Sequence, residues 1–170
     1  MPEKHPQVSP EQLLRIADAV PAAVTVYNIE TAQYLYVNKA VTSVLGYSPD
    51  EFMAGGLGFV VSLIHPDDVE ELLAKNREAL DLAYIQMAEE DELIASFEYR
   101  MLHKNGRYRC VRTDGTVFGR SADGEVELIL NVTTDISEQK RTEIRLRRGL
   151  KVLETVLDDS GTIEEKDVEF

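Results

Sequence analysis

Residues 97–111 read FEYRMLHKNGRYRCV, and residues 126–140 read VELILNVTTDISEQK. The Asn-Gly pair at 105–106 lies between two β-prone runs, which is the strongest short-range hairpin signal because glycine adopts positive φ without strain. A second turn is expected in SADGE at 121–125. Ser137 is suited to cap a helix, and an acidic residue follows it. The region therefore predicts three antiparallel strands that lead into a helix.

The N-terminal half predicts further helices and two strands. SPEQ at 9–12 is a helix-start signature, and an apolar stripe follows it over 10–20. Strands are expected at 23–28 and 33–37, where valine, threonine and tyrosine are frequent. These two strands and the three above belong to one sheet in the simplest interpretation.

Short helices are expected after the second strand. Asn38 is predicted to cap one that ends at Gly46, and Ser48 to cap another. GGLG at 55–58 indicates a hinge beside a pocket rather than a phosphate-binding loop, because no Lys-Ser or Lys-Thr pair follows it. Pro66 begins the longest helix, whose apolar side chains recur at helical spacing.

These elements predict an α+β domain, with a five-stranded antiparallel sheet and helices on one face. An N-terminal cap helix precedes the sheet and a C-terminal helix follows it. We expect four parts: an arm and cap helix at 1–21, the central domain at 22–136, a coiled-coil-like helix at 137–158, and an acidic, disordered tail at 159–170.

Short strings along the chain form an ordered set. They are YVNKA at 36–40, LGYSP at 45–49, IHPDD at 64–68, and EYR, HKNG and DISEQK between 98 and 140. The set resembles PAS domains, the sensory modules of bacterial kinases and regulators, over roughly residues 10–140. Two positions depart from the family, Cys110 where it often has Trp and Asn131 where it often has Gly. The resemblance implies the PAS architecture with a C-terminal signalling helix.

The composition limits the classes of function. The chain has 170 residues, of which 44% are hydrophobic and 29% charged, as in a folded globular domain. A net charge of −13 argues against nucleic acid or an anionic membrane as a partner, since both would repel it. No apolar run approaches the ~20 residues that cross a bilayer, no signal peptide is evident, and the single cysteine excludes an intramolecular disulfide. We expect a cytoplasmic protein.

Catalytic, metal and cofactor chemistry is not expected. The three histidines have no Ser or Cys partner in an activating motif, and no Cys or His residues have zinc-site spacing. The carboxylates at 89–92 are expected to be solvated. The resemblance disfavours flavin, because residues 53–64 lack the cysteine of light-sensing relatives. It also disfavours haem, because residues 67–88 contain no histidine.

The strand at 126–136 has two faces, because side chains alternate along a strand. One face carries Ile129, Asn131 and Thr133, and the other carries Leu128, Leu130 and Val132. The resemblance to ligand-binding PAS members implies that the first set faces a pocket. The second set is then an apolar stripe that needs a cover. The candidate is the helix at 10–20, from this chain or from a partner, through Leu13, Leu14, Ile16 and Ala17.

By the same resemblance, three residues of the first hairpin strand face inward: Phe97, Tyr99 and Met101. A two-residue turn would put Cys110 on that face, whereas a three-residue turn with a glycine bulge would put Val111 and Thr113 there. The resemblance favours the bulged turn. The pocket would then suit a small, mostly apolar ligand, with Asn131 and Thr113 as polar contacts. The alternative is a packed core that binds no ligand.

The C-terminal helix at 138–158 carries leucines at alternating spacings of four and three, as in a coiled-coil seam: Leu146, Leu150, Leu153 and Leu157. The seam is short and polar at its start, so we expect it to dimerise weakly. The motif that joins it to the last strand, Asp135, Ile136 and Ser137, is expected to relay a signal. The alternative is a helix that packs on its own domain.

We therefore expect a PAS sensor or interaction module in signal transduction, which senses a small ligand or a protein partner and forms a homodimer. Its state would pass through the C-terminal helix to an effector kinase or regulator, as in two-component systems. The alternative is a ligand-free PAS scaffold that only dimerises. A small α+β enzyme using the same cavity is disfavoured, because no acid–base pair or activated nucleophile is present.

Overall fold

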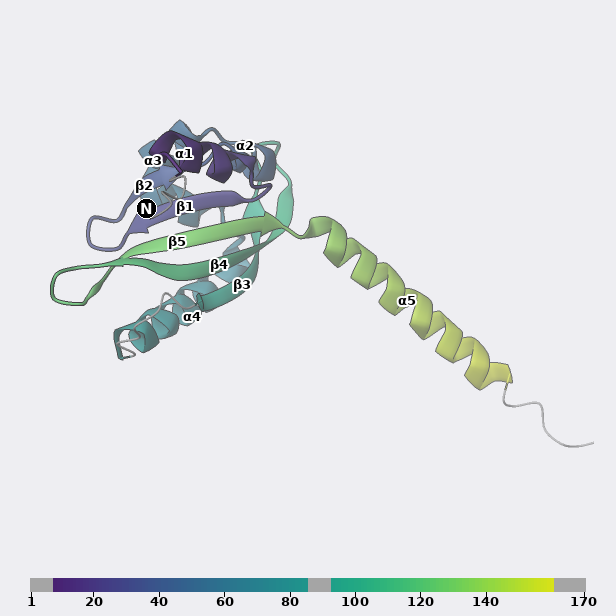
Figure 1. Cartoon of the computed structure of the whole chain (residues 1–170). Helices are drawn as coiled ribbons and strands as arrows, with labels where there is room; N and C mark the ends of the chain where they lie inside the picture. Colours follow the sequence, from purple (N-terminus) through teal and green to yellow (C-terminus); the bar gives the residue numbers. More distant parts are fainter. Residues whose placement is uncertain (1–7, 86–92, 161–170) are drawn as a thin grey trace, which may run out of the picture. The chain divides into compact units, whose positions relative to one another are not determined.

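The sheet forms the centre of the protein. The computed structural model describes residues 8–85 and 93–160, and contacts divide the chain into two units, Met1–Ile136 and Ser137–Phe170. In the first unit, five antiparallel strands have the order β2-β1-β5-β4-β3 (Figure 1). The strands are β1 (Ala23–Asn28), β2 (Gln33–Val37), β3 (Leu93–Leu102), β4 (Tyr108–Arg120) and β5 (Val126–Asp135). The predicted fold class is confirmed.

Helices pack against four of the strands. The helices of the first unit are α1 (Pro10–Ala19), α2 (Ala40–Leu45), α3 (Pro49–Leu63) and α4 (Pro66–Ile85). Helix α2 contacts β1 and β5, α3 contacts β2, and α4 contacts β3. Figure 1 shows α4 running alongside β3.

Local sequence signals place the helix starts. The Ser9 hydroxyl accepts a hydrogen bond from the Gln12 N–H (3.2 Å), and the Gln12 side chain accepts one from the Ser9 N–H (2.8 Å). Ser48 and Glu51 form the same capping box at the start of α3. Gly46 ends α2 at φ 83°, in the left-handed region that glycine tolerates. These three predictions are confirmed.

Asn38 does not cap α2, and that prediction was wrong. Lys39 holds the N-cap position without a side-chain hydrogen bond. The buried Asn38 amide accepts a hydrogen bond from the Val24 N–H (2.9 Å) and donates to the carbonyls of Ala17 (2.8 Å) and Ala22 (3.0 Å). It therefore pairs backbone groups between the end of α1 and the start of β1 that would otherwise lack partners.

The third helix contains a backbone break where the hinge was predicted. Gly56 has φ 59° and ψ −163°, which is not helical. The helix continues after the break to Leu63, whereas the sequence predicted only its first part. Because a residue with a side chain is strained at such angles, the glycine permits this change of direction.

The hairpin between β3 and β4 has the three-residue turn. The His103 N–H donates to the Arg107 carbonyl (2.9 Å), and the Gly106 N–H donates to the His103 carbonyl (2.8 Å). Gly106 has φ 82°, as the glycine bulge requires. Tyr99 consequently pairs with Val111, and the two-residue alternative is excluded.

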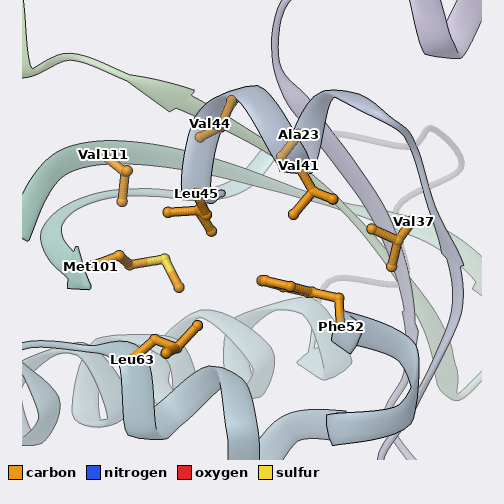
Figure 2. Close-up of a cluster of buried hydrophobic side chains, with 9 residues drawn as sticks. All are labelled: Ala23, Val37, Val41, Val44, Leu45, Phe52, Leu63, Met101 and Val111. Carbon is orange, nitrogen blue, oxygen red and sulfur yellow. The ribbon is translucent and has the colours of Figure 1, made fainter. Parts of the chain in front are cut away.

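The main core lies between the sheet and helices α2 and α3. Figure 2 shows its buried side chains, which are Ala23, Val37, Val41, Val44, Leu45, Phe52, Leu63, Met101 and Val111. Leu45, Leu63 and Met101 point toward one another from three different elements. Burial of each such side chain contributes about 1.5–3 kcal/mol. A second cluster of Ala83, Val117, Val126 and Ile129 joins α4 to the strands.

Two apolar surfaces remain partly exposed on the first unit. No residue of α1 is buried, and Leu13, Leu14 and Ile16 are 56%, 52% and 57% exposed. Ala17 is half-buried. The outward-facing residues of β5 are also only half-buried, and they are Leu128, Leu130 and Val132. The chain's own α1 does not bury its apolar stripe, so cover by a partner chain stays a prediction.

The second unit contains α5 (Ser137–Ser160). Leu146, Leu150 and Leu153 are each about 60% exposed, at 64%, 62% and 59%. The Leu157 side chain lies outside the described part of the chain, as do the arm at 1–7, the acidic segment at 86–92 and the tail at 161–170. The coiled-coil seam stays a prediction.

Candidate ligand-binding site

A cavity lies between the inner face of the sheet and helices α3 and α4. It has two adjacent lobes of about 150 and 290 Å³. Six residues line both lobes, namely Tyr34, Leu57, Leu73, Asn76, Phe97 and Asn131. The smaller lobe reaches Leu45 and Met101 of the core, and the larger lobe reaches Ala79 and Ile129. The volume is that of a small-molecule site rather than a packing defect.

The pairing of β4 with β5 positions the polar residue at the junction of the lobes. Asn131 lies opposite Gly115 in the sheet. A Cβ atom on Gly115 would lie 3.3 Å from Asn131 Oδ1. The glycine therefore leaves room for the amide, as is common where a strand residue has no side chain to pack.

A chain of hydroxyl groups crosses the inner wall. The Tyr99 and Thr113 hydroxyls lie 2.8 Å apart, and those of Thr113 and Thr133 lie 2.8 Å apart. Burial raises the pKa of Tyr99, and the hydrogen bond to Thr113 opposes this rise. The phenol therefore stays neutral, and each hydroxyl already has a partner within the protein.

Other polar groups of the wall lack such partners. Within residues 8–85 and 93–160, the side chains of Asn131, Thr25 and Tyr34 form no hydrogen bond to another protein group. Burial raises the pKa of Tyr34 strongly. Thr25 is buried and Tyr34 and Asn131 are partly buried. Polar groups inside a protein normally pair with protein or water, so these side chains are available to a bound molecule.

The structure brings most of the predicted pocket residues to the cavity. The smaller lobe is lined by Phe97, Tyr99, Met101, Thr113, Asn131 and Thr133, and the larger by Phe97, Ile129 and Asn131. Val111 lines neither lobe, because it is fully buried in the core. Thr113 faces the cavity but already bonds to Tyr99 and Thr133, so it is a weaker polar contact than Asn131.

Many residues of the wall were not predicted as pocket residues, among them Thr25, Tyr27, Tyr34 and Leu57. The first three lie on β1 and β2, where alternation of side chains gives the inner face once the pairing of β1 with β5 is known. Leu57 reaches the wall only because the chain turns at Gly56. The sequence contains no local signal for that turn direction.

An ion pair fixes the start of α4 to β3, beside the cavity. Asp68 accepts hydrogen bonds from the Arg100 backbone N–H (2.8 Å), from Nε (2.9 Å) and from a terminal nitrogen of the guanidinium (2.5 Å). These bonds lower the pKa of Asp68 from 3.8 to about 2. The paired geometry holds one wall of the cavity in place.

A second arginine joins α2 to the last strand. One terminal nitrogen of Arg109 donates to the carbonyls of Ser43 (3.1 Å) and Val44 (3.0 Å) and to the Asp135 carboxylate (2.9 Å). Both side chains are mostly shielded from solvent, at 28% and 29% exposed. Asp135 of the predicted relay motif is thereby linked to a helix whose Leu45 lines the cavity.

Among the described residues, no group of three or more His, Cys, Asp or Glu side chains is arranged to hold a metal ion. The carboxylates at 89–92 lie outside those residues. Over the same part of the chain, no helix has the length and apolar character needed to cross a membrane.

Comparisons with known proteins agree on the fold. The family profile of the PAS fold matches residues 34–133. The PAS domain of a protein from Colwellia psychrerythraea superposes with a TM-score of 0.60 at 20% identity, over 75% of this chain and 97% of that one. A sensory box histidine kinase/response regulator from Burkholderia thailandensis gives 0.59 at 22% identity, over 86% and 99%.

A methyl sulfide methyltransferase-associated sensor from Methanosarcina acetivorans is similar in sequence. The identity is 31% over 122 residues, which is 72% of this chain and 11% of that protein. The chain thus spans about a tenth of the length of this relative. With the profile match over most of the first unit, these findings show that the chain belongs to the PAS family, the generally non-catalytic sensory domains of signalling proteins.

Proposed function

We propose that this PAS domain is a sensor that binds a small organic molecule in its cavity. The proposal rests on the unpaired polar groups of Asn131, Thr25 and Tyr34 in a wall that is mostly apolar. A ligand with matching hydrogen-bonding groups would satisfy them while its apolar part fills the lobes. Haem and flavin are disfavoured, because residues 67–88 contain no histidine and residues 53–64 contain no cysteine.

Native mass spectrometry of the purified chain tests ligand binding. We expect a fraction of the protein to carry a copurified molecule of constant mass. Ala79 is buried and lines the larger lobe, so Ala79→Leu should reduce that fraction by filling the lobe. Ala74→Leu is the matched control, since Ala74 is exposed on the same helix. Bare protein in all three samples would contradict the sensor.

We further propose that the cavity communicates with α5 through Arg109. A ligand that displaces Leu45 would move the end of α2, whose last carbonyls bond to Arg109. Arg109 would pass this movement to Asp135, which Ile136 and Ser137 follow in the chain. A ligand changes the position of Asp135 only if it binds more tightly to one position of α2 than to the other.

We propose a homodimer as the functional assembly. The apolar stripe of α1 and the half-buried outer residues of β5 support it, since both would gain from burial against a second copy. Ile16→Glu should lower the mass by light scattering toward that of a monomer. Truncation after Ser137 tests the coiled-coil seam by the same measurement. A truncated chain that still has the mass of a dimer would show that α5 is not needed for dimerisation.

A ligand-free scaffold is the second candidate function. The same exposed stripe of α1 favours it, because the stripe supports assembly whether or not the cavity is filled. A stable dimer with an empty cavity in the mass-spectrometry experiment would select this candidate. The enzyme hypothesis has no observation in its favour.

The effector is proposed from the relatives. The similar structure from Burkholderia thailandensis belongs to a sensory box histidine kinase/response regulator, and the relative from Methanosarcina acetivorans is a sensor associated with a methyltransferase. We propose that this chain controls a kinase or regulator in the cytoplasm, without nucleic acid or membrane as partners. Phosphotransfer by the kinase, measured with and without this chain, tests whether the chain controls it.

A further inference from the structure

We propose that the cavity selects an uncharged ring compound that bears an amide-like pair of a hydrogen-bond donor and an acceptor, and that Asn131 reads this pair. The inference rests on the proposed sensor function and adds the chemical class of its ligand. It follows from the charge, the polar groups and the shape of the cavity wall.

The wall carries no charge that could pair with an ionic ligand. Among the described residues that line the two lobes, none is Asp, Glu, Lys, Arg or His. Charged residues gather instead in a neighbouring pocket with Asp68, Glu71, Lys75 and Glu98. Moving an unpaired ion from water into an apolar cavity is costly, so the cavity rejects carboxylates and ammonium or amidinium ions.

The available polar groups match an amide. Asn131 lies where the two lobes meet, and Asn76 of α4 lines the same junction. An Asn side chain has a carbonyl oxygen that accepts and an NH₂ group that donates, so it pairs with a group that has the reverse order. Asn131 lies opposite Gly115, and the missing side chain of the glycine leaves room for the Asn131 amide oxygen. A ligand that leaves this amide unpaired binds less tightly.

The rest of the wall fits a ring. Tyr27, Tyr34 and Phe97 contribute aromatic side chains to the larger lobe. Flat ligands pack well against such rings in offset or edge-on contact. An apolar cavity of ~150 Å³ holds a benzene-sized molecule, and the smaller and larger lobes measure about 150 and 290 Å³. The cavity therefore admits one or two fused rings.

Three ligands of the same shape test this inference: benzamide, which is neutral, benzoate, which is an anion, and benzamidine, which is a cation at pH 7. Each is titrated into the full chain, and binding is followed by protein-detected NMR. We expect benzamide to bind at least about tenfold more tightly than either ion. Benzoate or benzamidine binding as well as benzamide would overturn the inference, and so would a failure of all three to bind.

Substitution of Asn131 tests its role. Asn131→Asp should shift the preference from benzamide toward benzamidine by about tenfold, because the cation gains a carboxylate partner. The same exchange in the exposed hairpin turn, Asn105→Asp, should leave the preference unchanged. Asn131→Leu should weaken benzamide by about tenfold while toluene, which has the same ring and no amide, still binds.

Two outcomes separate this inference from the sensor proposal. Unchanged benzamide binding to Asn131→Leu would show that Asn131 does not recognise the ligand, and the sensor proposal would be unaffected. A charged molecule copurified with the chain in the mass-spectrometry experiment would likewise overturn the ligand class and support the sensor. Asn131→Leu keeps the number and branching of the side-chain heavy atoms, so it tests the role of Asn131 even if the Asp variant is unstable.

Discussion

Replacing Asp68 with asparagine should destabilise the fold in a way that depends on pH. Asp68 is 21% exposed and Arg100 is 39% exposed, so their pair is partly shielded from water. Its hydrogen bonds with Arg100 lower the pKa of Asp68 from 3.8 to about 2. A shift of this size corresponds to about 2.5 kcal/mol at neutral pH, and screening by solvent reduces it to about 2 kcal/mol.

The sign of the pH dependence follows from the lowered pKa. The ionised carboxylate is favoured in the folded state, so its contribution is fully present above the unfolded value of 3.8 and is lost as the pH falls toward about 2. The free-energy difference between wild type and Asp68→Asn should therefore be equal at pH 7 and pH 5, and should fall to about half at pH 3.

Urea unfolding of both proteins at pH 7, 5 and 3 provides the measurement. Glu71→Gln is the control, because Glu71 pairs with Lys75 on the surface of the same helix, where the two side chains are 71% and 57% exposed. Such a pair contributes little. A difference that is the same at pH 3 as at pH 7, or no loss of stability in Asp68→Asn, would refute the role assigned to the ion pair.

Three more predictions concern the fold and the relay. Gly46→Ala should cost at least about 1 kcal/mol of stability, since φ is 83° and a Cβ atom would lie 2.8 Å from His103. Gly58 has no atom within 4 Å of an added Cβ, so Gly58→Ala should stabilise the fold by up to about 1 kcal/mol. Thermal melts measure both effects. Tyr99→Phe should cost about 1 kcal/mol in urea, because it removes one hydrogen bond. Arg109→Ala should cost about 1.5–3 kcal/mol and speed amide exchange at Ser137.

Each of these has an outcome that would contradict it. Equal effects of alanine at the two glycines would show that backbone angle and space do not control them. A neutral Tyr99→Phe would mean that the hydroxyl chain adds nothing to stability. For the relay, Arg107→Ala in the exposed turn is the control. Amide exchange at Ser137 that stays slow in Arg109→Ala would show that Arg109 does not act on α5.

Features determined by neighbouring residues were predictable from the sequence. The capping boxes at Ser9 and Ser48 join residues three positions apart, so their patterns are complete in a short window. Both turns of the β3–β5 meander contain glycine at positive φ, at Gly106 and Gly124. The register of the first hairpin follows from its turn, which fixes the inner face of β3 and β4.

Features determined by residues far apart in the chain were not predictable from the sequence. Asn38 has a sequence context that suits a helix cap, yet its amide bonds to groups at Ala17, Ala22 and Val24. Tyr34 reaches the cavity because β2 pairs with β1 at the edge of the sheet. No local sequence pattern predicts such pairings, because the energy that selects them comes from packing between elements far apart in the chain.

The strand order has a consequence for the way this domain is used. Ala23, which opens β1, pairs with Thr133 close to the end of β5. The polypeptide thus enters and leaves the sheet at adjacent strands, which lie about 4.8 Å apart. A longer protein can accommodate such a domain between two of its own segments without forcing them apart, and repeated copies can follow one another along one chain.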